Sequence, residues 1–415
     1  MHRNRDFDLQ RKLPPNEPAL TQDLELDTLF SAMARGDRFL LNVVKSAFLG
    51  SENDLDLIRY RQNILKDCLN NSSAIKDMYA LTVESIEREK KSYFFFFSRY
   101  PSSILYNSVE LLQIYVDILI RLRAIVDEHA KKFESDGFTA LFAMLKKELS
   151  SEYFAIIQNH LRELKFRDGV LMSAELGKGN EGANYMLRKL NEKKQGWFKR
   201  VLAWKSPVLS FSINPRDEGG ARALSELRDR GINLAANALA QSSDHIRNFL
   251  ATLRTELAFY IGCLNLYERL AQMEAPISFP MPAPAGERSL SYKGLYDVCL
   301  ALTMKEKIVG NDVKADNKNV AIITGANQGG KSTFLRSIGL SQLMMQCGMF
   351  VTAESFCSNV CDSLFTHYKR EEDAAMISGK LDEELSRMSG IVDNIKPNSM
   401  ILLNESFSAT NEREG

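Results

Sequence analysis

Two long stretches of this 415-residue chain contain no proline: residues 19–100 and residues 102–206. Proline breaks the hydrogen-bond ladder of a helix interior, so its absence over such lengths permits long helices. Apolar side chains recur there at three- and four-residue steps, which is the spacing of one helix face. The clearest stripe predicts a helix from about residue 104 to 132, and another predicts one from residue 243 to 272. The chain is therefore expected to be built around long helices.

Length and charge set further bounds. A chain of 415 residues is too long for one simple core, so two or three domains are expected. Lys plus Arg equals Asp plus Glu, at 53 each, so any binding to nucleic acid must come from local patches. The six cysteines form neither a zinc pattern nor a disulfide framework. No apolar stretch has the length of a signal peptide or a bilayer span, which predicts a cytoplasmic protein without a membrane partner.

The pattern changes between the helical regions. Residues 169–177 and 208–214 look like short strands flanked by Gly, Asn and Pro, which predicts a small β-containing insertion at about 168–215. Four prolines within residues 276–284 exclude a continuous helix, and we expect the main domain boundary there. The expected order is a tail at 1–18, a helical core at 19–274, a Pro-rich linker at 275–286 and a last domain at 287–415.

A glycine-rich loop follows an apolar run near the C-terminus. Residues 320–323 are expected to form a short strand, and the apolar residues after position 333 have helical spacing. Glycines let successive N–H groups point inward, where they and the helix N-terminus attract phosphate. Lys331 should reach the β- and γ-phosphates, and the Ser332 hydroxyl should ligate Mg²⁺. The pattern predicts a site for ATP and Mg²⁺; a chance glycine-rich turn is the alternative. The expected binding residues are Gly325, Asn327, Gly329, Gly330, Lys331, Ser332 and Thr333.

A second apolar run, residues 400–403, ends in Asn404 and Glu405. At the end of a strand, Glu405 is placed to orient or deprotonate a water that attacks the γ-phosphate; a surface acid in a turn is the alternative. Asn404 stands where such motifs normally carry Asp. Its amide can accept a hydrogen bond from a Mg²⁺-bound water, but it brings no negative charge to the cation. A site that binds ATP and scarcely hydrolyses it is therefore a second hypothesis.

The loop at residues 324–333 is similar to the Thr-Gly-Pro-Asn-Met-Gly-Gly-Lys-Ser-Thr loop of the MutS family of DNA mismatch-repair ATPases. Ala326 and Gln328 are the departures. Residues 309–313 resemble the family's Val-Pro-Asn-Asp element, which implies that Asn311 lies close to the adenine.

Other segments extend the resemblance over most of the chain. Residues 403–410 stand where the family has Asp-Glu followed by a loop rich in Gly, Ser and Thr. Residues 28–33 and 59–68 resemble the start of its helical core domain.

The resemblance implies a multidomain α and α/β protein. A helical core or lever domain with a small β-containing insertion would precede a P-loop ATPase domain of the ABC/MutS type, apparently truncated at its C-terminus. The mismatch-recognition and connector domains would be missing, so mismatch reading is not expected. ATP binding and hydrolysis would close a dimer and move helical arms. An ABC transporter ATPase is disfavoured, because the long N-terminal helical region does not belong to that architecture.

A further helix is expected to open near Ser378, a good N-cap residue. Its inner face should carry Leu381, Leu385, Met388 and Val392. The resemblance implies that such a helix start contacts the γ-phosphate held by the partner subunit, which predicts a homodimer joined through its ATPase domains. An ordinary capped helix is the alternative.

Both tryptophans of the chain lie among cationic residues within positions 188–205. Such a stretch is suited to grip phosphates of double-stranded or branched DNA without reading sequence. A solvated helix face with aromatic side chains packed beneath it is the alternative. The candidate DNA contacts are Lys193, Lys194, Lys199 and Arg200.

Overall fold

The computed structural model of the chain describes residues 5–50, 52–92, 100–167, 169–189, 209–326, 328–370 and 380–407. Contacts divide the chain into two compact units. The first unit contains Met1–Tyr79, Ile125–Met144 and Thr252–Gly415, and the second contains Ala80–Ala124 and Leu145–Ala251. Within the described ranges, no helix combines the length and the apolar composition that a bilayer span requires.

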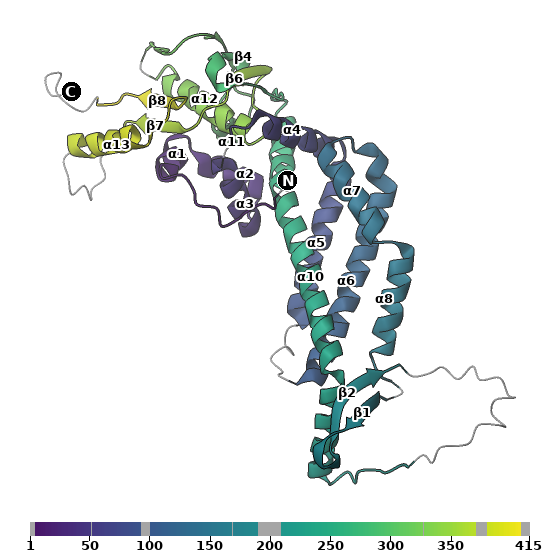
Figure 1. Cartoon of the computed structure of the whole chain (residues 1–415). Coiled ribbons are helices and arrows are strands. Elements are labelled where there is room, and N and C mark those ends of the chain that lie inside the picture. The colour runs from purple at the N-terminus through teal and green to yellow at the C-terminus, as the bar shows by residue number, and fades with distance from the viewer. Residues whose placement is uncertain are drawn as a thin grey trace. The chain divides into compact units, whose positions relative to one another are not determined.

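Long helices dominate the second unit. They are the later part of α5 (Ser72–Ser92), most of α6 (Pro101–His129), α8 (Ser151–Glu163) and the first part of α10 (Glu218–Gln272). In Figure 1, α6, α8 and this part of α10 run side by side. Their apolar stripes meet in a core that includes Val109, Leu112, Val116 and Leu161. Both predicted long helices are confirmed, and α10 begins well before the expected residue 243.

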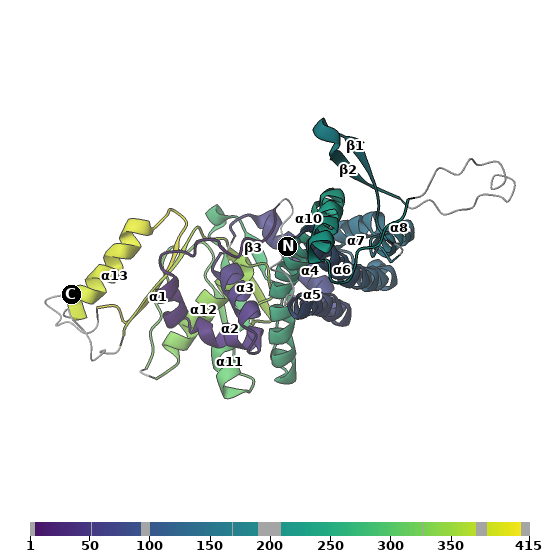
Figure 2. The same cartoon turned by 90° about the horizontal axis from the view of Figure 1, so that it is seen from below.

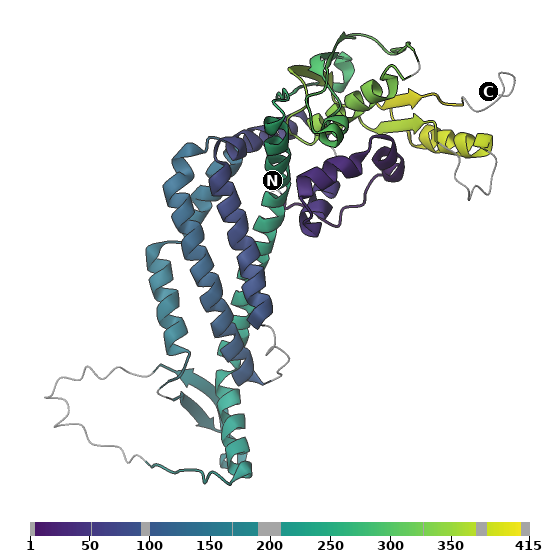
Figure 3. The ribbon, with the colours of Figure 1, turned by 180° about the vertical axis from the view of Figure 1, so that it is seen from behind.

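An antiparallel hairpin follows α8, and Figure 3 shows it beside α10. Its strands are β1 (Leu171–Leu176) and β2 (Gly182–Arg188), joined through the 3-10 turn η3 (Lys178–Asn180). The strand predicted at residues 169–177 is therefore confirmed. The one predicted at 208–214 is wrong, because residues 209–214 have no strand structure and β2 takes the place beside β1. A nearby segment with alternating half-buried and exposed residues pairs through a short turn, whereas a distant apolar run does not.

The first unit opens with short helices that provide much of its core. They are α1 (Glu17–Asp23), α2 (Leu26–Ala34), α3 (Arg38–Leu49) and α4 (Leu55–Asn70). Asp37 and Asp54 cap α3 and α4 by accepting hydrogen bonds from backbone N–H groups in the first turn. The 3-10 turn η2 (Ala130–Lys132) ends α6, and α7 (Asp136–Glu148) follows it.

Two separate sheets complete the first unit. One has the strand order β3 (Met281–Ala283), β6 (Ser355–Asn359), β4 (Leu290–Leu295) and β5 (Asn311–Lys314). Strand β3 lies inside the expected Pro-rich linker, with the 3-10 turn η4 (Ala285–Glu287) after it. The other sheet is a parallel pair of β7 (Leu364–Tyr368) and β8 (Met400–Asn404), which confirms the strand expected before Glu405.

Helices cover the parallel pair. Helix α1 and helix α13 (Lys380–Asn394) pack against β7, and α12 (Lys331–Gln346) packs against β8. Figure 2 shows α13 alongside these strands. Helix α11 (Val298–Met304) contacts both α2 and α12. The helix predicted after the glycine loop is thus confirmed as α12.

The strand predicted at residues 320–323 is not formed. The segment has no strand structure, and Val320 and Ile322 are 76% and 85% exposed. A β-strand depends on a hydrogen-bonded neighbour, and no described segment pairs with these residues. Their β-branched side chains favour an extended backbone but cannot supply the missing neighbour.

Candidate functional site

The glycine loop enters α12 through a left-handed turn. Gly330, the N-cap residue of α12, has φ +81°, and Gln328 has φ +63°. Gly330 has no side chain to cap the helix, so it supplies no side-chain acceptor to the first N–H groups of α12. A helix of this length with free N–H groups at its start attracts an anion.

A pocket of about 430 Å³ lies at this end of α12. It is within the size range of pockets that bind small molecules. Its lining brings together most of the residues predicted to bind the nucleotide: Asn311, Gly325, Gly329, Gly330, Lys331 and Thr333. Asn311 comes from β5 and the others from the loop and the first turn of α12, so residues distant in sequence meet here.

Lys331 is folded back over its own loop. Its Nζ donates hydrogen bonds to the carbonyl oxygens of Gly325 and Ala326, each at 2.9 Å. Two neutral carbonyl groups thus hold a full positive charge at the mouth of the pocket. A phosphate group would offer charged acceptors to the same ammonium, and hydrogen bonds between ionised groups are the stronger ones.

One side of the pocket is apolar. Tyr296, Leu300, Ile308, Val309 and Phe334 line it, and none of them is among the site residues predicted from the sequence. Val309 is 87% exposed, so part of this apolar lining is open to solvent. Such a surface suits a flat heteroaromatic ring. The only sequence signal for it was the position of Val309 in the element that contains Asn311.

Ser332 and Asn404 contact each other through their side chains. The Ser332 hydroxyl donates to Asn404 Oδ1 at 3.2 Å, and Asn404 Nδ2 donates to Ser332 Oγ at 3.0 Å. Hydroxyl and amide oxygens are hard donors that fit Mg²⁺. No group of three His, Cys, Asp or Glu residues suited to a metal occurs in the described ranges. A Mg²⁺ ion here would therefore need phosphate oxygens and water as further ligands.

Glu405 follows β8 at once and is half exposed. Its Oε2 lies 3.6 Å from Nζ of Lys369, the residue after β7. Its backbone is left-handed, with φ +50°, and Phe407 two residues later has φ +60°. Glu405 therefore lies in a left-handed turn at the carboxyl end of the strand pair, at the end of the strand as predicted from the sequence.

The inner face of α13 agrees only in part with the expected one, since Leu381 and Met388 are half-buried. Leu385 and Val392 are 50% and 64% exposed, whereas Glu384 and Ile391 are buried. The rotation of α13 differs because the helix covers β7, which presents polar groups to it, namely the His367 ring and the Tyr368 carbonyl. Arg387 donates two hydrogen bonds of 3.1 Å to the Tyr368 carbonyl oxygen. Hydrogen bonds to β7, rather than the leucine stripe, set the rotation of α13.

A buried ion pair anchors α12 next to the pocket. Arg336 pairs with Asp297, the N-cap residue of α11, and with Glu25 before α2. The Asp297 side chain is fully buried and also accepts hydrogen bonds from the N–H groups of Cys299 and Leu300. Burial raises the pKa of its carboxyl group, although Arg336 acts in the opposite direction. The first turns of α12 are thus tied to α11.

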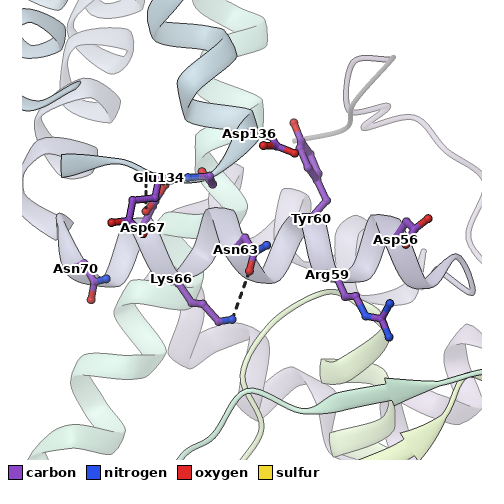
Figure 4. A pocket seen from close by; sticks show the side chains of 10 residues that line it. Asp56, Arg59, Tyr60, Asn63, Lys66, Asp67, Asn70, Glu134 and Asp136 are labelled. Atoms are coloured by element: carbon purple, nitrogen blue, oxygen red, sulfur yellow. Dashed lines mark hydrogen bonds between the residues drawn. The ribbon is translucent and has the colours of Figure 1, made fainter. Parts of the chain in front are cut away.

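A second pocket, along α4, contains none of the predicted site residues (Figure 4). Its most buried carboxylate, Asp67, accepts hydrogen bonds of 2.8 to 3.2 Å from the N–H groups of Glu134 and Ser135. These contacts hold the segment before α7 to α4. Asp67 therefore has a structural role.

Some predicted residues lie outside the part of the chain that the structure describes. They are Asn327, Ser378, Lys193, Lys194, Lys199 and Arg200. Their roles stay predictions.

Two family models match this combination of a long-helix region and a glycine loop that opens a helix. The MutS2 N-terminal domain matches residues 53–273, and MutS domain V matches residues 321–415. The first match alone covers just over half of the chain. The chain belongs to the MutS family.

Curated relatives agree with this assignment. DNA mismatch repair protein MutS of Chloroflexus aurantiacus is 28% identical over 194 residues, which cover 46% of this chain and 20% of that protein. The MutS protein of Acetivibrio thermocellus is 32% identical over 190 residues, covering 45% and 22%. MutS protein homolog 4 of Mus musculus is 28% identical over 172 residues, covering 39% and 18%. The matched part spans about a fifth of each relative.

Proposed function

We propose that this protein binds ATP with Mg²⁺ in the pocket at the start of α12 and hydrolyses it. Residues 287–415 would form a P-loop ATPase domain, and residues 19–274 a helical core or lever domain joined to it through residues 275–286. The observation that carries the proposal is the pocket itself. It combines a free helix N-terminus, the Lys331 ammonium and an apolar wall in a volume of about 430 Å³.

The parts of the pocket have distinct roles in this proposal. The apolar wall and Asn311 would hold the base, while the loop N–H groups and Lys331 would bind the phosphates. Ser332 and Asn404 would hold Mg²⁺, the latter through water, and the ion would neutralise charge on the phosphate oxygens. Glu405 would orient the attacking water, after leaving its ion pair with Lys369.

We infer DNA as the wider partner from the relatives, two of which are named as DNA mismatch repair proteins. The helical arms would contact double-stranded or branched DNA without sequence preference, with Lys193, Lys194, Lys199 and Arg200 as candidates. Nucleotide binding would close a homodimer through the ATPase domains and move the arms. Mismatch reading itself is not part of this proposal.

A second candidate is an interaction module that binds ATP and scarcely hydrolyses it. Two observations favour it. Asn404 offers a neutral amide to the cation, and the Glu405 carboxylate is paired with Lys369. Both features would weaken the hydrolytic step more than ATP binding.

The first test is ATP affinity in Lys331→Ala, measured by calorimetry with Mg²⁺. Loss of the ammonium removes charge-assisted hydrogen bonds to phosphate, so affinity should fall about 10- to 100-fold. Lys318→Ala, which removes an exposed lysine before the loop, is the matched control and should bind as the wild type does. Unchanged affinity in Lys331→Ala would refute the nucleotide site.

Glu405→Gln separates the two candidates. Phosphate release should fall about 100-fold or more if Glu405 acts on the attacking water, while ATP affinity stays the same. A wild-type protein that binds ATP without releasing phosphate supports the interaction module instead.

A further inference from the structure

His367 is a fully buried histidine in the middle of β7 that has no part in the proposed reaction. Both of its ring nitrogens are engaged. Nδ1 lies 2.8 Å from the Ser406 hydroxyl oxygen, and Nε2 lies 3.1 Å from the carbonyl oxygen of Glu384. A buried imidazole with partners on both sides has a fixed orientation. It therefore connects the residue after Glu405 to helix α13.

Two further contacts adjoin this one. The Ser406 hydroxyl also lies 2.9 Å from the backbone carbonyl oxygen of His367, and its one proton can be donated either to this carbonyl or to Nδ1. The ring of Phe407 stacks on the imidazole, with centroids 5.4 Å apart and an angle of 28°. The two residues that follow Glu405 are thus both held by His367.

The turn needs such support because its backbone is unusual. Glu405 has φ +50° and Phe407 has φ +60°. Residues other than glycine seldom adopt this left-handed conformation, and it persists only where the surroundings impose it. Without the contacts of His367, the turn would relax and the Glu405 carboxylate would lose its fixed direction.

The two ring nitrogens have different partners. Nε2 faces a carbonyl oxygen, which can only accept, so Nε2–H donates to Glu384. Nδ1 and the Ser406 hydroxyl oxygen share one hydrogen bond. His367 thus connects the turn to β7 and to α13 through its contacts.

We propose that His367 is a positioning residue that holds the turn presenting Glu405 and couples this turn to α13. The proposal rests on the proposed function, in which Glu405 orients the attacking water. This coupling would let a movement of α13 change the position of Glu405. A displacement of α13 would pull on the Glu384 carbonyl, and through the imidazole it would reach the turn that carries Glu405.

Two substitutions separate the two nitrogens. An asparagine amide can replace Nδ1 and keep the contact to Ser406, whereas a glutamine amide can replace Nε2 and keep the contact to Glu384. Hydrogen–deuterium exchange of the full chain without nucleotide should therefore distinguish His367→Asn from His367→Gln. Amides 404–407 should exchange about fivefold or more faster in His367→Gln, with strand amides 400–403 unchanged. His367→Asn should exchange within about twofold of the wild type.

Ser406→Ala provides the same test without altering the buried ring, in case His367→Gln does not fold. It should also speed the exchange of amides 404–407. In phosphate-release assays, His367→Gln and Ser406→Ala should lower kcat about 10- to 100-fold with KM for ATP little changed. His367→Asn should retain most of the wild-type kcat.

Equal exchange in the wild type, His367→Gln and Ser406→Ala would overturn the proposal. Faster exchange with unchanged kcat would overturn it too, because the turn would then have no part in the reaction. A wild-type protein that releases no phosphate would instead refute the hydrolytic part of the proposed function. The exchange measurement still decides in that case whether His367 holds the turn.

Discussion

The two ends of α12 are built in opposite ways. At its start, the loop is exposed, and the partners of Lys331 among the described residues are carbonyl groups of its own loop. At its end, Gln342 and Gln346 are almost completely buried and hydrogen-bonded. One end is free to change its partners, while the other is locked into the core. Ligand-binding segments are commonly drawn from the less stable parts of a fold, and here one helix contains both extremes.

The locked end also joins segments that are distant in sequence. Gln342 Nε2 donates to the Asn359 carbonyl at 2.9 Å, and Gln346 Nε2 donates to the carbonyl groups of Glu52 and Cys361 at 3.0 Å. Cys361 N–H returns a hydrogen bond to Gln346 Oε1. Helix α12 is therefore tied to the segment before α4 and to the segment before β7. A movement of the loop would therefore act on a helix whose far end is fixed in the core.

The largest effect on stability is expected from Arg336→Ala, between the two ends of α12. It leaves the buried Asp297 carboxylate without its cation, which costs about 3–5 kcal/mol in comparable buried pairs. Thermal or urea unfolding measures this loss. If the free energy of unfolding falls by less than about 1 kcal/mol, Arg336 does not fix α12 in the core, and the weakly held start of the helix extends beyond residue 336.

The same variant makes a prediction about pH. Burial raises the pKa of Asp297 in the folded protein above its ordinary value of 3.8, and loss of Arg336 should raise it further. At pH values between the unfolded and the folded pKa of Asp297, the folded state binds more protons than the unfolded state. Stability therefore rises as the pH falls through the folded pKa toward the unfolded one. The deficit of Arg336→Ala relative to the wild type should be smaller at about pH 5 than at about pH 8.

The next effect is expected from Gln342→Ala at the locked end. It leaves the Ser358 hydroxyl and the Asn359 carbonyl buried without their amide partner, which should cost about 2 kcal/mol or more. ATP affinity should not change, because the loop does not depend on this network. Gln272→Ala, at the exposed end of α10, is the control and should stay within about 0.5 kcal/mol of the wild type. Weaker ATP binding in Gln342→Ala would show that the loop does depend on the buried network at the other end of α12.

Local patterns predicted the helices of the long-helix region, α12 and β8, because helical spacing and short apolar runs are encoded within each segment. The strand at residues 320–323 failed because a strand depends on a neighbour that local sequence does not contain. The inner face of α13 was predicted only in part, for a related reason. The hydrogen bonds between α13 and β7, such as the one between the Glu384 backbone carbonyl and His367, become possible only in the fold, and the leucine stripe could not indicate them.

The positions of the candidate-site residues were also predicted only in part. The contact between Ser332 and Asn404 and the gathering of the loop with Asn311 agree with the motifs. Motifs identify residues whose chemistry is constrained by phosphate and metal. The apolar wall with Leu300 and Val309 needs only bulk and hydrophobicity, which many sequences satisfy, and it had no distinct signal. His367 was missed because its partners Glu384 and Ser406 become neighbours only in the fold.

The smallest effect is expected at the free end, from Asn404→Asp. The new carboxylate cannot donate to Ser332 as the amide does, but it adds negative charge beside the hydroxyl proposed to hold Mg²⁺. The Mg²⁺ concentration needed for half-maximal ATP turnover, or for half-maximal ATP binding if turnover is absent, should fall about tenfold or less. Asn63→Asp adds the same charge on α4, away from the loop, and should leave this concentration unchanged. If both variants respond equally, the overall charge is responsible and Asn404 does not face the cation. If only Asn404→Asp responds and its unfolding is unchanged, the free end of α12 tunes ligand binding without cost to the fold.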